Sequence, residues 1–416
     1  MTFFPPASMT PRVARAIVLV FLVTATGCAT AKKKPPTSDK PWSTRMAETV
    51  VAQHPKPARW ELDKKRQEPK WSYATSFATY AVTTAGVAQG EGKFVEYGKS
   101  YIDAFIDKDG KLTTKTYKAK DYKLDDILPG RLALLMLKQT GEPRYRVTAD
   151  TLAKQLTTHP RTADGGYWHK KTYKQQMWLD GIFMDCPFMV EYAEVAKEPR
   201  WFDEAANQII TISKHTRDPR TGLYFHGWDE SRAERWSNKE TGTSPHVWGR
   251  AVGWYFMGMV ETLDRLPRDH PRRSEVEQIY RELAAAIAAA QDQPSGVWWQ
   301  VMDEPGRKGN YLESSASSMF VYSMAKGVRL GVLDEKYNEV ARKGYDGIIE
   351  RFIWVDPHEA DQIRLSDTCK VAGLGGKKPY RDGSFKYYIS EPRIDNDPKG
   401  VAPFILASME IERLAR

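Results

Sequence analysis

The chain has 416 residues, of which 41% are hydrophobic, 28% charged and 12% aromatic. This composition is that of a globular protein and excludes a largely disordered chain, and the length allows one large domain or two ordinary ones. The formal net charge of +9 favours acidic partners without specifying one. The 13 tryptophans and 20 tyrosines suit either core packing or the stacking of sugar rings on aromatic faces, and both interpretations stay open.

The N-terminal segment, residues 1–28, is predicted to be a targeting signal. Arg12 and Arg15 form a short basic region, and the apolar run that follows at 16–23 is too short to span a membrane as a mature helix. Small residues then precede Cys28, which resembles a bacterial lipobox; a plain secretory signal is the alternative. We therefore expect a lipoprotein signal peptide, a lipidated Cys28 and membrane contact through this anchor alone.

Residues 29–41 are rich in lysine, proline, threonine and serine, a composition typical of a flexible tether. The lysines at 32–34 could instead form a nucleic-acid patch, but no nucleic-acid-binding module is visible and no such partner is expected. Ala29 follows the cysteine directly, which resembles the outer-membrane sorting pattern of Gram-negative lipoproteins. The expected location is the outer membrane, on its periplasmic or its surface face.

Apolar residues recur at helical spacing through nearly all of the remaining chain, and no stretch shows sustained strand alternation. The pattern predicts twelve helices, at 42–54, 72–89, 94–107, 124–140, 144–158, 177–196, 200–216, 246–266, 273–292, 314–332, 335–353 and 400–415. Short turns rich in glycine and proline alternate with long links. The long links are 55–71, 108–123, 159–176, 217–245, 293–313 and 354–399.

Short links make antiparallel hairpins, so this alternation predicts a closed double ring of six inner and six outer helices. The predicted fold is an all-α (α/α)6 toroid that forms a single domain over residues 42–416. The helices at 177–196 and 246–266 are rich in aromatic residues, methionine and glycine, as inner helices should be, whereas 273–292 has a polar face. All long links should then lie at one end of the ring and enclose a mouth.

Polar and aromatic residues gather at this predicted mouth: Asp125, Asp126, His169, Lys170, Trp178, Asp180, His226, Trp248 and Arg250. Aspartate at a helix start is commonly an N-cap, so capping and catalysis both stay open for Asp125. A carboxylate at the start of an apolar helix is costly unless it is used or paired, which favours a function for Asp180. Arg250, on an inner helix, needs an anionic partner, either from the protein or from a substrate.

Other chemistries fit the sequence poorly. It contains no HExxH, paired CxxC, P-loop or GxSxG motif, and its eight histidines are scattered, so neither a metal nor a cofactor is expected. Cys186 lies in an apolar helical run and is expected to be a buried free thiol. An oxidising compartment would permit a disulfide between Cys186 and Cys369, and the sequence leaves both states open.

Seven tracts of the chain together resemble glycoside hydrolase family 105, the unsaturated rhamnogalacturonyl hydrolases. They are YKLDD at 122–126, GYWHK at 166–170, QMWLDG at 176–181, YFHGWDE at 224–230, TGTSPHVWGRAVGW at 241–254, NYLESSASSMF at 310–320, and the segment from YRDGS at 380–384 to NDPKG at 396–400. The resemblance covers roughly residue 42 to the C-terminus. The family is an (α/α)6 barrel, in agreement with the predicted fold.

The resemblance implies a hydrolase that releases a terminal 4,5-unsaturated uronic acid, galacturonyl or glucuronyl, from small anionic oligosaccharides made by lyases, such as rhamnogalacturonan fragments. In this family an aspartate protonates C4 and water adds at C5, giving a hemiketal that opens and expels the remaining sugar. Two carboxylates flanking the anomeric carbon are therefore not required. By this pattern Asp180 is the general acid, which then activates the water, and Asp125 is the second aspartate. The implied substrate contacts are His169, Lys170, Trp178 as a stacking wall, His226, Trp248 and Arg250.

An acid at neutral pH must hold a proton, so we expect the pKa of Asp180 to be raised by burial beside tryptophan and by the charge of Asp125, against the helix dipole. Two other functions stay open. One is a non-catalytic glycan-binding lipoprotein, which would not need Asp180. The other is a different (α/α)6 sugar enzyme, such as an epimerase or a two-carboxylate glycosidase.

Overall fold

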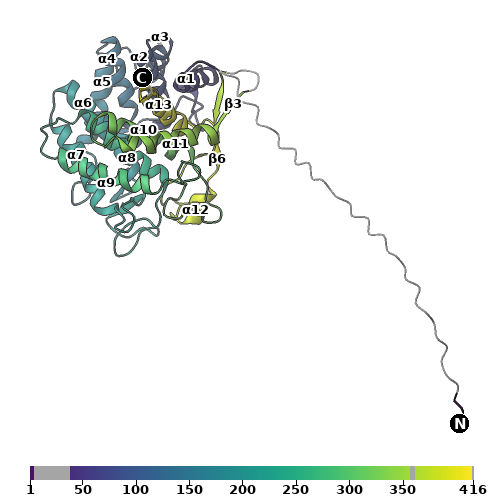
Figure 1. Ribbon diagram of the computed structural model, residues 1–416. Helices are drawn as coiled ribbons and strands as arrows, with labels where there is room; N and C mark the ends of the chain where they lie inside the picture. Colours follow the sequence, from purple (N-terminus) through teal and green to yellow (C-terminus); the bar gives the residue numbers. More distant parts are fainter. Residues whose placement is uncertain (4–37, 357–360, 415–416) are drawn as a thin grey trace. The chain divides into compact units, whose positions relative to one another are not determined.

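The structure is a computed structural model that describes residues 1–3, 38–356 and 361–414 (Figure 1). Nearly all of the predicted signal peptide, with Cys28, and residues 29–37 of the predicted tether lie outside this description. Lipidation and outer-membrane location therefore stay predictions. Within the part of the chain that is described, thirteen α-helices dominate, accompanied by three 3-10 turns and six strands of two or three residues.

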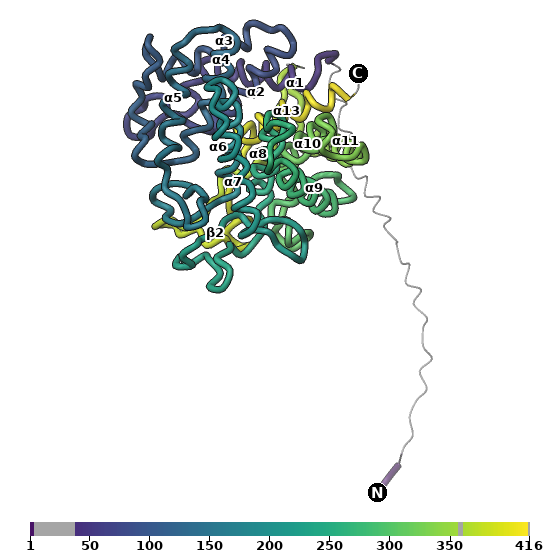
Figure 2. The backbone as a smooth tube through the Cα atoms, turned by 90° about the vertical axis from the view of Figure 1, so that its left-hand side faces the viewer, coloured from purple at the N-terminus to yellow at the C-terminus, as the bar shows by residue number. Residues whose placement is uncertain are grey.

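Six helices form a closed inner ring, in which each helix contacts the next and the last contacts the first. In ring order they are α2 (Tyr73–Gln89), α4 (Pro129–Thr140), α6 (Leu179–Ala196), α8 (Gly249–Arg265), α10 (Ser314–Arg329) and α13 (Pro398–Leu414). Figure 2 shows α6, α8 and α10 following one another through the body of the protein. This ring confirms the predicted all-α (α/α)6 toroid.

Each inner helix packs most extensively against one outer helix. Five outer helices follow their partners in the chain, and the sixth pair joins the two ends, because α1 packs against α13. The outer helices are α3 (Gly92–Asp103), α5 (Arg144–Thr157), α7 (Arg200–Thr216), α9 (Arg273–Ala289), α11 (Lys336–Phe352) and α1 (Trp42–Gln53). Since inner and outer helices alternate in direction, all inner helices start at the same end, where the long links lie.

The burial of each helix follows from its sequence. Every residue from Gly249 to Leu263 of α8 is buried, as an inner helix packed on all sides requires. Gly258 permits the close approach of α6, because a Cβ atom there would lie 3.0 Å from the backbone of Ile182. In α9, by contrast, the buried residues recur at three- and four-residue spacing and leave one face to solvent.

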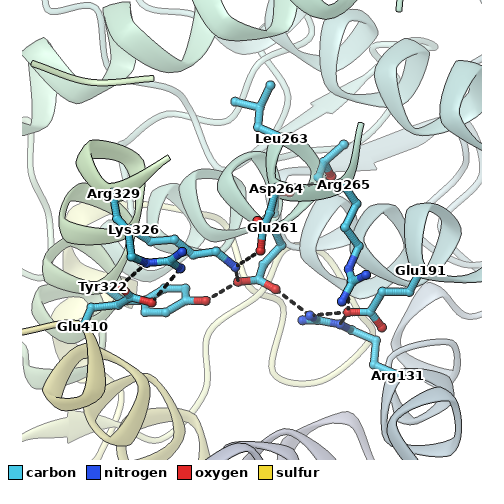
Figure 3. Close-up of polar contacts among 12 residues, drawn as sticks. Arg131, Glu191, Glu261, Leu263, Asp264, Arg265, Tyr322, Lys326, Arg329 and Glu410 are labelled. Atoms are coloured by element: carbon cyan, nitrogen blue, oxygen red, sulfur yellow. Dashed lines mark hydrogen bonds and ion pairs between the residues drawn. The ribbon is translucent and has the colours of Figure 1, made fainter. Parts of the chain in front are cut away.

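A network of buried charges and hydroxyls connects the inner helices α2, α4, α6, α8 and α10 (Figure 3). Arg131 on α4 donates to Tyr80 of α2 at 3.0 Å, Glu191 of α6 at 2.7 Å and Glu261 of α8 at 2.5 Å. Glu261 in turn accepts from Tyr322 and Lys326 of α10. Arg329 of α10 forms a further, partly exposed ion pair with Glu410 of α13.

The long links contain structure that the sequence pattern did not predict. Three antiparallel pairs form there, and they are β1 (Gln176–Trp178) with β2 (Gly227–Asp229), β3 (Ile353–Val355) with β4 (Ile363–Leu365), and β5 (Thr368–Cys369) with β6 (Arg393–Ile394). A thirteenth helix, α12 (Phe385–Ser390), starts at Ser384, whose side chain accepts from the amide of Tyr387. The sixth long link therefore carries a helix.

The prediction that Asp125 and Asp126 open the fourth helix is wrong. They lie in a separate 3-10 turn, η3 (Leu124–Asp126), and α4 starts at Pro129. Proline fixes φ and lacks an amide hydrogen, so it suits the first position of a helix. The other two 3-10 turns are η1 (Pro57–Arg59) and η2 (Ala119–Asp121).

Cys186 is a buried free thiol, as predicted, and Cys369 is also buried and free. Neither cysteine therefore cross-links the ring. No helix in the described ranges is long and apolar enough to cross a membrane.

Candidate active site

The pairing of β1 with β2 brings Asp180 next to His226. Trp178 at the end of β1 lies opposite Gly227, and the amide of Leu179 donates to the carbonyl of His226 at 3.0 Å. Asp180 follows in the first turn of α6, and its Oδ2 lies 3.2 Å from Nε2 of His226. The imidazole is fully buried, whereas 13% of the aspartate side chain is exposed. The two predicted residues thus form a close pair at the predicted end of the ring.

Several polar atoms at this end are buried without a hydrogen-bond partner in the described chain. The 3.2 Å contact lacks the alignment of a hydrogen bond, so Oδ2 of Asp180 and Nε2 of His226 both remain unpartnered. The same holds for Nδ1 of His169 and Nε of Arg250. Buried polar atoms are normally paired, so this concentration of unpaired ones marks a place for a polar ligand.

The expected rise in the pKa of Asp180 is wrong for the protein without substrate. Burial raises this pKa, as expected, but His226 opposite the carboxylate, together with His169, outweighs burial and lowers it. Asp125, which was expected to raise the pKa of Asp180, is not among the main causes of this shift. The free protein therefore holds Asp180 as a carboxylate that faces an imidazole.

His169 lies between the second predicted aspartate and an aromatic stack. Its Nε2 lies 3.6 Å from Oδ1 of Asp125, and burial lowers the pKa of His169 to about 4, so the ring is neutral at pH 7. The imidazole stacks on Trp178 with ring centroids 4.5 Å apart, and Tyr173 stacks on the same indole at 4.7 Å. Lys170 places its ammonium 4.1 Å from the centre of the Tyr173 ring.

Trp178 and Trp248 are almost completely buried, with exposed fractions of 5% and 1%. Trp178 is covered by His169 and Tyr173, and Trp248 donates from its indole nitrogen to Gln300 at 3.2 Å. Substrate stacking on Trp178 stays a prediction. The half-buried Tyr173 is the ring of this stack that solvent reaches more easily.

Arg250 is buried in the first turn of α8 and has no carboxylate within 4 Å among residues 38–356 and 361–414. Its Nη1 donates to the carbonyl of Cys369 and, at 3.4 Å, to the hydroxyl of Ser315. Burial lowers the pKa of this guanidinium, but Cys369 and Glu313 outweigh burial and raise it, so the group stays charged. Glu313 is itself occupied, because it caps α10 and accepts from the amide of Cys369 at 2.9 Å.

Sequence reasoning missed Tyr73, which opens α2 at the same end of the ring. Burial raises the pKa of its hydroxyl, Asp125 and Asp180 raise it further, and Arg250 lowers it. The charges of these three predicted site residues therefore reach the same hydroxyl. The signal available in the sequence was the position of this tyrosine at the start of an inner helix.

Asp126 is a second residue whose environment the sequence did not reveal. Burial raises its pKa to about 7, and the ammonium of Lys123 lies 4.0 Å away. Its backbone carbonyl accepts from the indole of Trp71 at 2.8 Å. Asp126 therefore anchors the turn that presents Asp125, and it titrates near neutral pH.

Tyr388 was also missed, because it lies in the unpredicted helix α12. Its hydroxyl lies 2.9 Å from Nδ1 of His226, and its ring is fully buried and nearly parallel to that of Trp248. A serine cap at Ser384 before a short aromatic run was the available signal for this helix.

Comparison with known proteins agrees with this geometry. The family model described as Glycosyl Hydrolase Family 88 matches residues 42–415. A family 105 glycoside hydrolase of Clostridium acetobutylicum is 40% identical, with a TM-score of 0.84 over 90% of this chain and 100% of that one. An unsaturated glucuronyl hydrolase of Bacillus sp. GL1 shares the fold at 13% identity, with a TM-score of 0.65 over 89% of this chain and 95% of that one.

Two sequence relatives add to this comparison. Protein Atu3128 of Agrobacterium fabrum is 40% identical over 56% of this chain and its own full length. The unsaturated rhamnogalacturonyl hydrolase YesR of Bacillus subtilis is 25% identical over 67% of this chain and 76% of its own. Fold and comparisons together define a glycosidase built on a helical toroid. The chain belongs to Glycosyl Hydrolase Family 88 as that model describes it and, as the resemblance implied, to glycoside hydrolase family 105.

Proposed function

We propose that this glycosidase removes a terminal 4,5-unsaturated uronic acid from lyase-generated oligosaccharides by hydrating the C4=C5 double bond. The observation that carries the proposal is Arg250, a buried charged guanidinium at the same end of the ring as the Asp180–His226 pair, with no carboxylate within 4 Å among the described residues. A buried guanidinium is stabilised by an anion that it can hydrogen-bond, and the carboxylate of a uronic acid meets this need.

The reaction uses Asp180 twice. Its proton goes to C4 while water adds to C5, and the carboxylate takes a proton from that water, so the acid is regenerated. The product is a hemiketal, whose bond between C5 and the ring oxygen breaks to give a ketone. The resulting hemiacetal at C1 then expels the remaining sugar.

Asp180 must gain a proton before this step, since its pKa is low in the free protein. A substrate carboxylate that binds beside it adds a negative charge and excludes water, and both changes raise the pKa of a carboxyl group. We infer that substrate binding itself protonates Asp180.

The preferred substrates are unsaturated uronides on rhamnose. Support comes from the names of two relatives, the rhamnogalacturonyl hydrolase of Bacillus subtilis and an unsaturated 3S-rhamnoglycuronyl hydrolase of Alteromonas sp., which is 23% identical over 66% of this chain. If Cys28 is lipidated, the protein acts outside the cytoplasm on lyase products before their uptake.

The direct test follows the ultraviolet absorbance of the conjugated enol ether in digests made by pectin, rhamnogalacturonan and glucuronan lyases. Wild-type protein should abolish the absorbance, and Asp180→Asn should lower kcat/KM by about 10³-fold or more. Asp185→Asn is the matched control, because it makes the same change in the same helix at a residue with no role in the reaction. No loss of absorbance on any digest would refute the proposal.

A further inference from the structure

His226 contacts two residues through its two ring nitrogens. Nε2 faces Asp180, and Nδ1 lies 2.9 Å from the hydroxyl of Tyr388, which is 162 positions away in the sequence. Tyr388 is completely buried on α12, and Gln300 donates to its backbone carbonyl at 3.2 Å while accepting from Trp248. Tyr388 therefore has a fixed place on the Nδ1 side of the imidazole, whereas Asp180 lies on the Nε2 side.

The hydrogen count of this contact favours one tautomer. In the described chain, His226 is the hydrogen-bond partner of the Tyr388 hydroxyl, and no other partner of that hydroxyl is found. If Nδ1 carried the proton, it would donate to the tyrosine oxygen and leave the buried hydroxyl hydrogen without an acceptor. Leaving a buried donor unpaired is costly, so the tyrosine donates and Nδ1 accepts.

We propose that Tyr388 is a positioning residue that holds His226 in the tautomer with its proton on Nε2, the nitrogen that lies 3.2 Å from the carboxylate of Asp180. This inference rests on the proposed function only in giving Asp180 the role of the acid. The imidazole then presents a hydrogen to the carboxylate after proton transfer to C4, and it orients the oxygen that removes a proton from water. Tyr388 acts through His226 and does not touch the substrate.

The groups that surround this pair are few. His169 and His226 act on the carboxylate of Asp180, while Tyr387, Asp180, Asp303 and Asp382 act on the hydroxyl of Tyr388. None of the latter three carboxylates is within hydrogen-bonding distance of that hydroxyl. The tautomer of His226 is therefore set by Tyr388.

The first test is independent of activity and uses full-length protein labelled with [15N]histidine. Nitrogen chemical shifts, assigned by their loss in His226→Gln, should show Nδ1 as an acceptor and Nε2 as protonated at neutral pH. A wild-type spectrum with the proton on Nδ1 would overturn the inference, whether or not the protein hydrolyses any uronide.

The second test compares Tyr388→Phe with Tyr387→Phe, a matched control on the same helix that loses a hydroxyl bonded to the amide of Gly373 at 3.0 Å. Tyr388→Phe should lower kcat about tenfold, the effect of one hydrogen bond, with little change in KM, and should change the His226 nitrogen shifts. It should also move the alkaline limb of kcat/KM to higher pH. Equal pH profiles and equal His226 spectra in the two variants would contradict the inference, and this spectral comparison applies even to a variant with reduced stability.

Discussion

Nε2 of His226 lies 3.2 Å from Oδ2 of Asp180, and this contact decides the charge of the residue assigned as the acid. Burial raises the pKa of Asp180, but the neighbouring imidazole outweighs burial and lowers this pKa below the ordinary value. Without substrate, the protein therefore holds Asp180 as the carboxylate. In the proposed reaction, this is the form that accepts a proton from water. In the proposed reaction, binding of the anionic substrate raises this pKa, and Asp180 then takes its proton from solvent.

Replacing His226 with glutamine should therefore raise the pKa of Asp180. Because the acid form is the active one, the alkaline limb of the kcat/KM profile should move to higher pH, while kcat at neutral pH falls by about 10²-fold through lost positioning. The measurement is a pH profile of kcat/KM for the variant and for wild type. A control is His54→Gln, which changes a histidine stacked on Trp60 outside the site. An unchanged limb would show that His226 does not set the charge of Asp180.

Arg250→Lys should weaken substrate binding more than it slows the chemical step. Lysine keeps the charge but cannot present the paired donors of a guanidinium to a carboxylate, so we expect kcat/KM to fall about 10²-fold, mainly through KM. Initial rates over a range of substrate concentrations separate the two effects. Arg272→Lys, on the outer surface beside Glu275, serves as the control and should leave both constants unchanged. A fall in kcat with an unchanged KM would argue against carboxylate binding by Arg250.

Asp185, in the middle of α6, should make stability depend on pH. It is 1% exposed, and burial raises its pKa to about 8. A carboxyl group whose pKa is raised by folding contributes its full stability below the unfolded pKa of about 4, and this contribution is lost as pH rises through about 8.

Asp185→Asn removes this dependence, so its melting temperature relative to wild type should increase between about pH 5 and pH 8 and then level off. Thermal melts across this range measure the difference, with the exposed Asp346→Asn as the control. A constant difference between variant and wild type would mean that Asp185 is ionised in the folded protein.

Glu261 should be a major contributor to stability and should not affect catalysis directly. It accepts from Arg131, Tyr322 and Lys326 in the network of Figure 3. Glu261→Gln removes the anion shared by Arg131 and Lys326, which keep only Glu191 and Asp264, and breaking a buried pair typically costs about 3–5 kcal/mol in the free energy of unfolding. Denaturant titration measures this loss, and kcat/KM of the folded variant should equal that of wild type. Glu194→Gln removes a partly exposed pair with Arg265 and should cost about 1 kcal/mol or less. Equal losses of unfolding free energy in the two variants would contradict the claim that the buried ion pairs contribute more than the partly exposed one.

The sequence predicted the ring well because the features that define the ring are local in the chain. Helical periodicity and the alternation of link lengths identified the inner and outer helices, and they placed Asp180 and Arg250 at the correct end. The start of the fourth helix was misplaced because Pro129 was not used as a start signal. The strands β1 and β2 are three residues each, too short to give a periodic signal.

The charge of Asp180 and the role of Tyr388 could not be predicted from the sequence. Both depend on where the ring of His226 points, and this is set by α12, which lies in the longest link. The pKa of Asp180 is a balance between burial and a neighbouring imidazole, and a sequence gives neither the distance nor the orientation of that neighbour.

The central claim is hydration of the double bond, with cleavage of the glycosidic bond as its consequence. A C-glycoside of a 4,5-unsaturated uronic acid separates the two steps, because carbon replaces the leaving oxygen at C1 and cleavage there is impossible. With wild-type protein and this compound, the account predicts loss of the enol-ether absorbance and a product that is heavier by one water, with neither change in Asp180→Asn. Unchanged absorbance for the C-glycoside, together with cleavage of the matching O-glycoside, would contradict the account and indicate attack at the anomeric carbon.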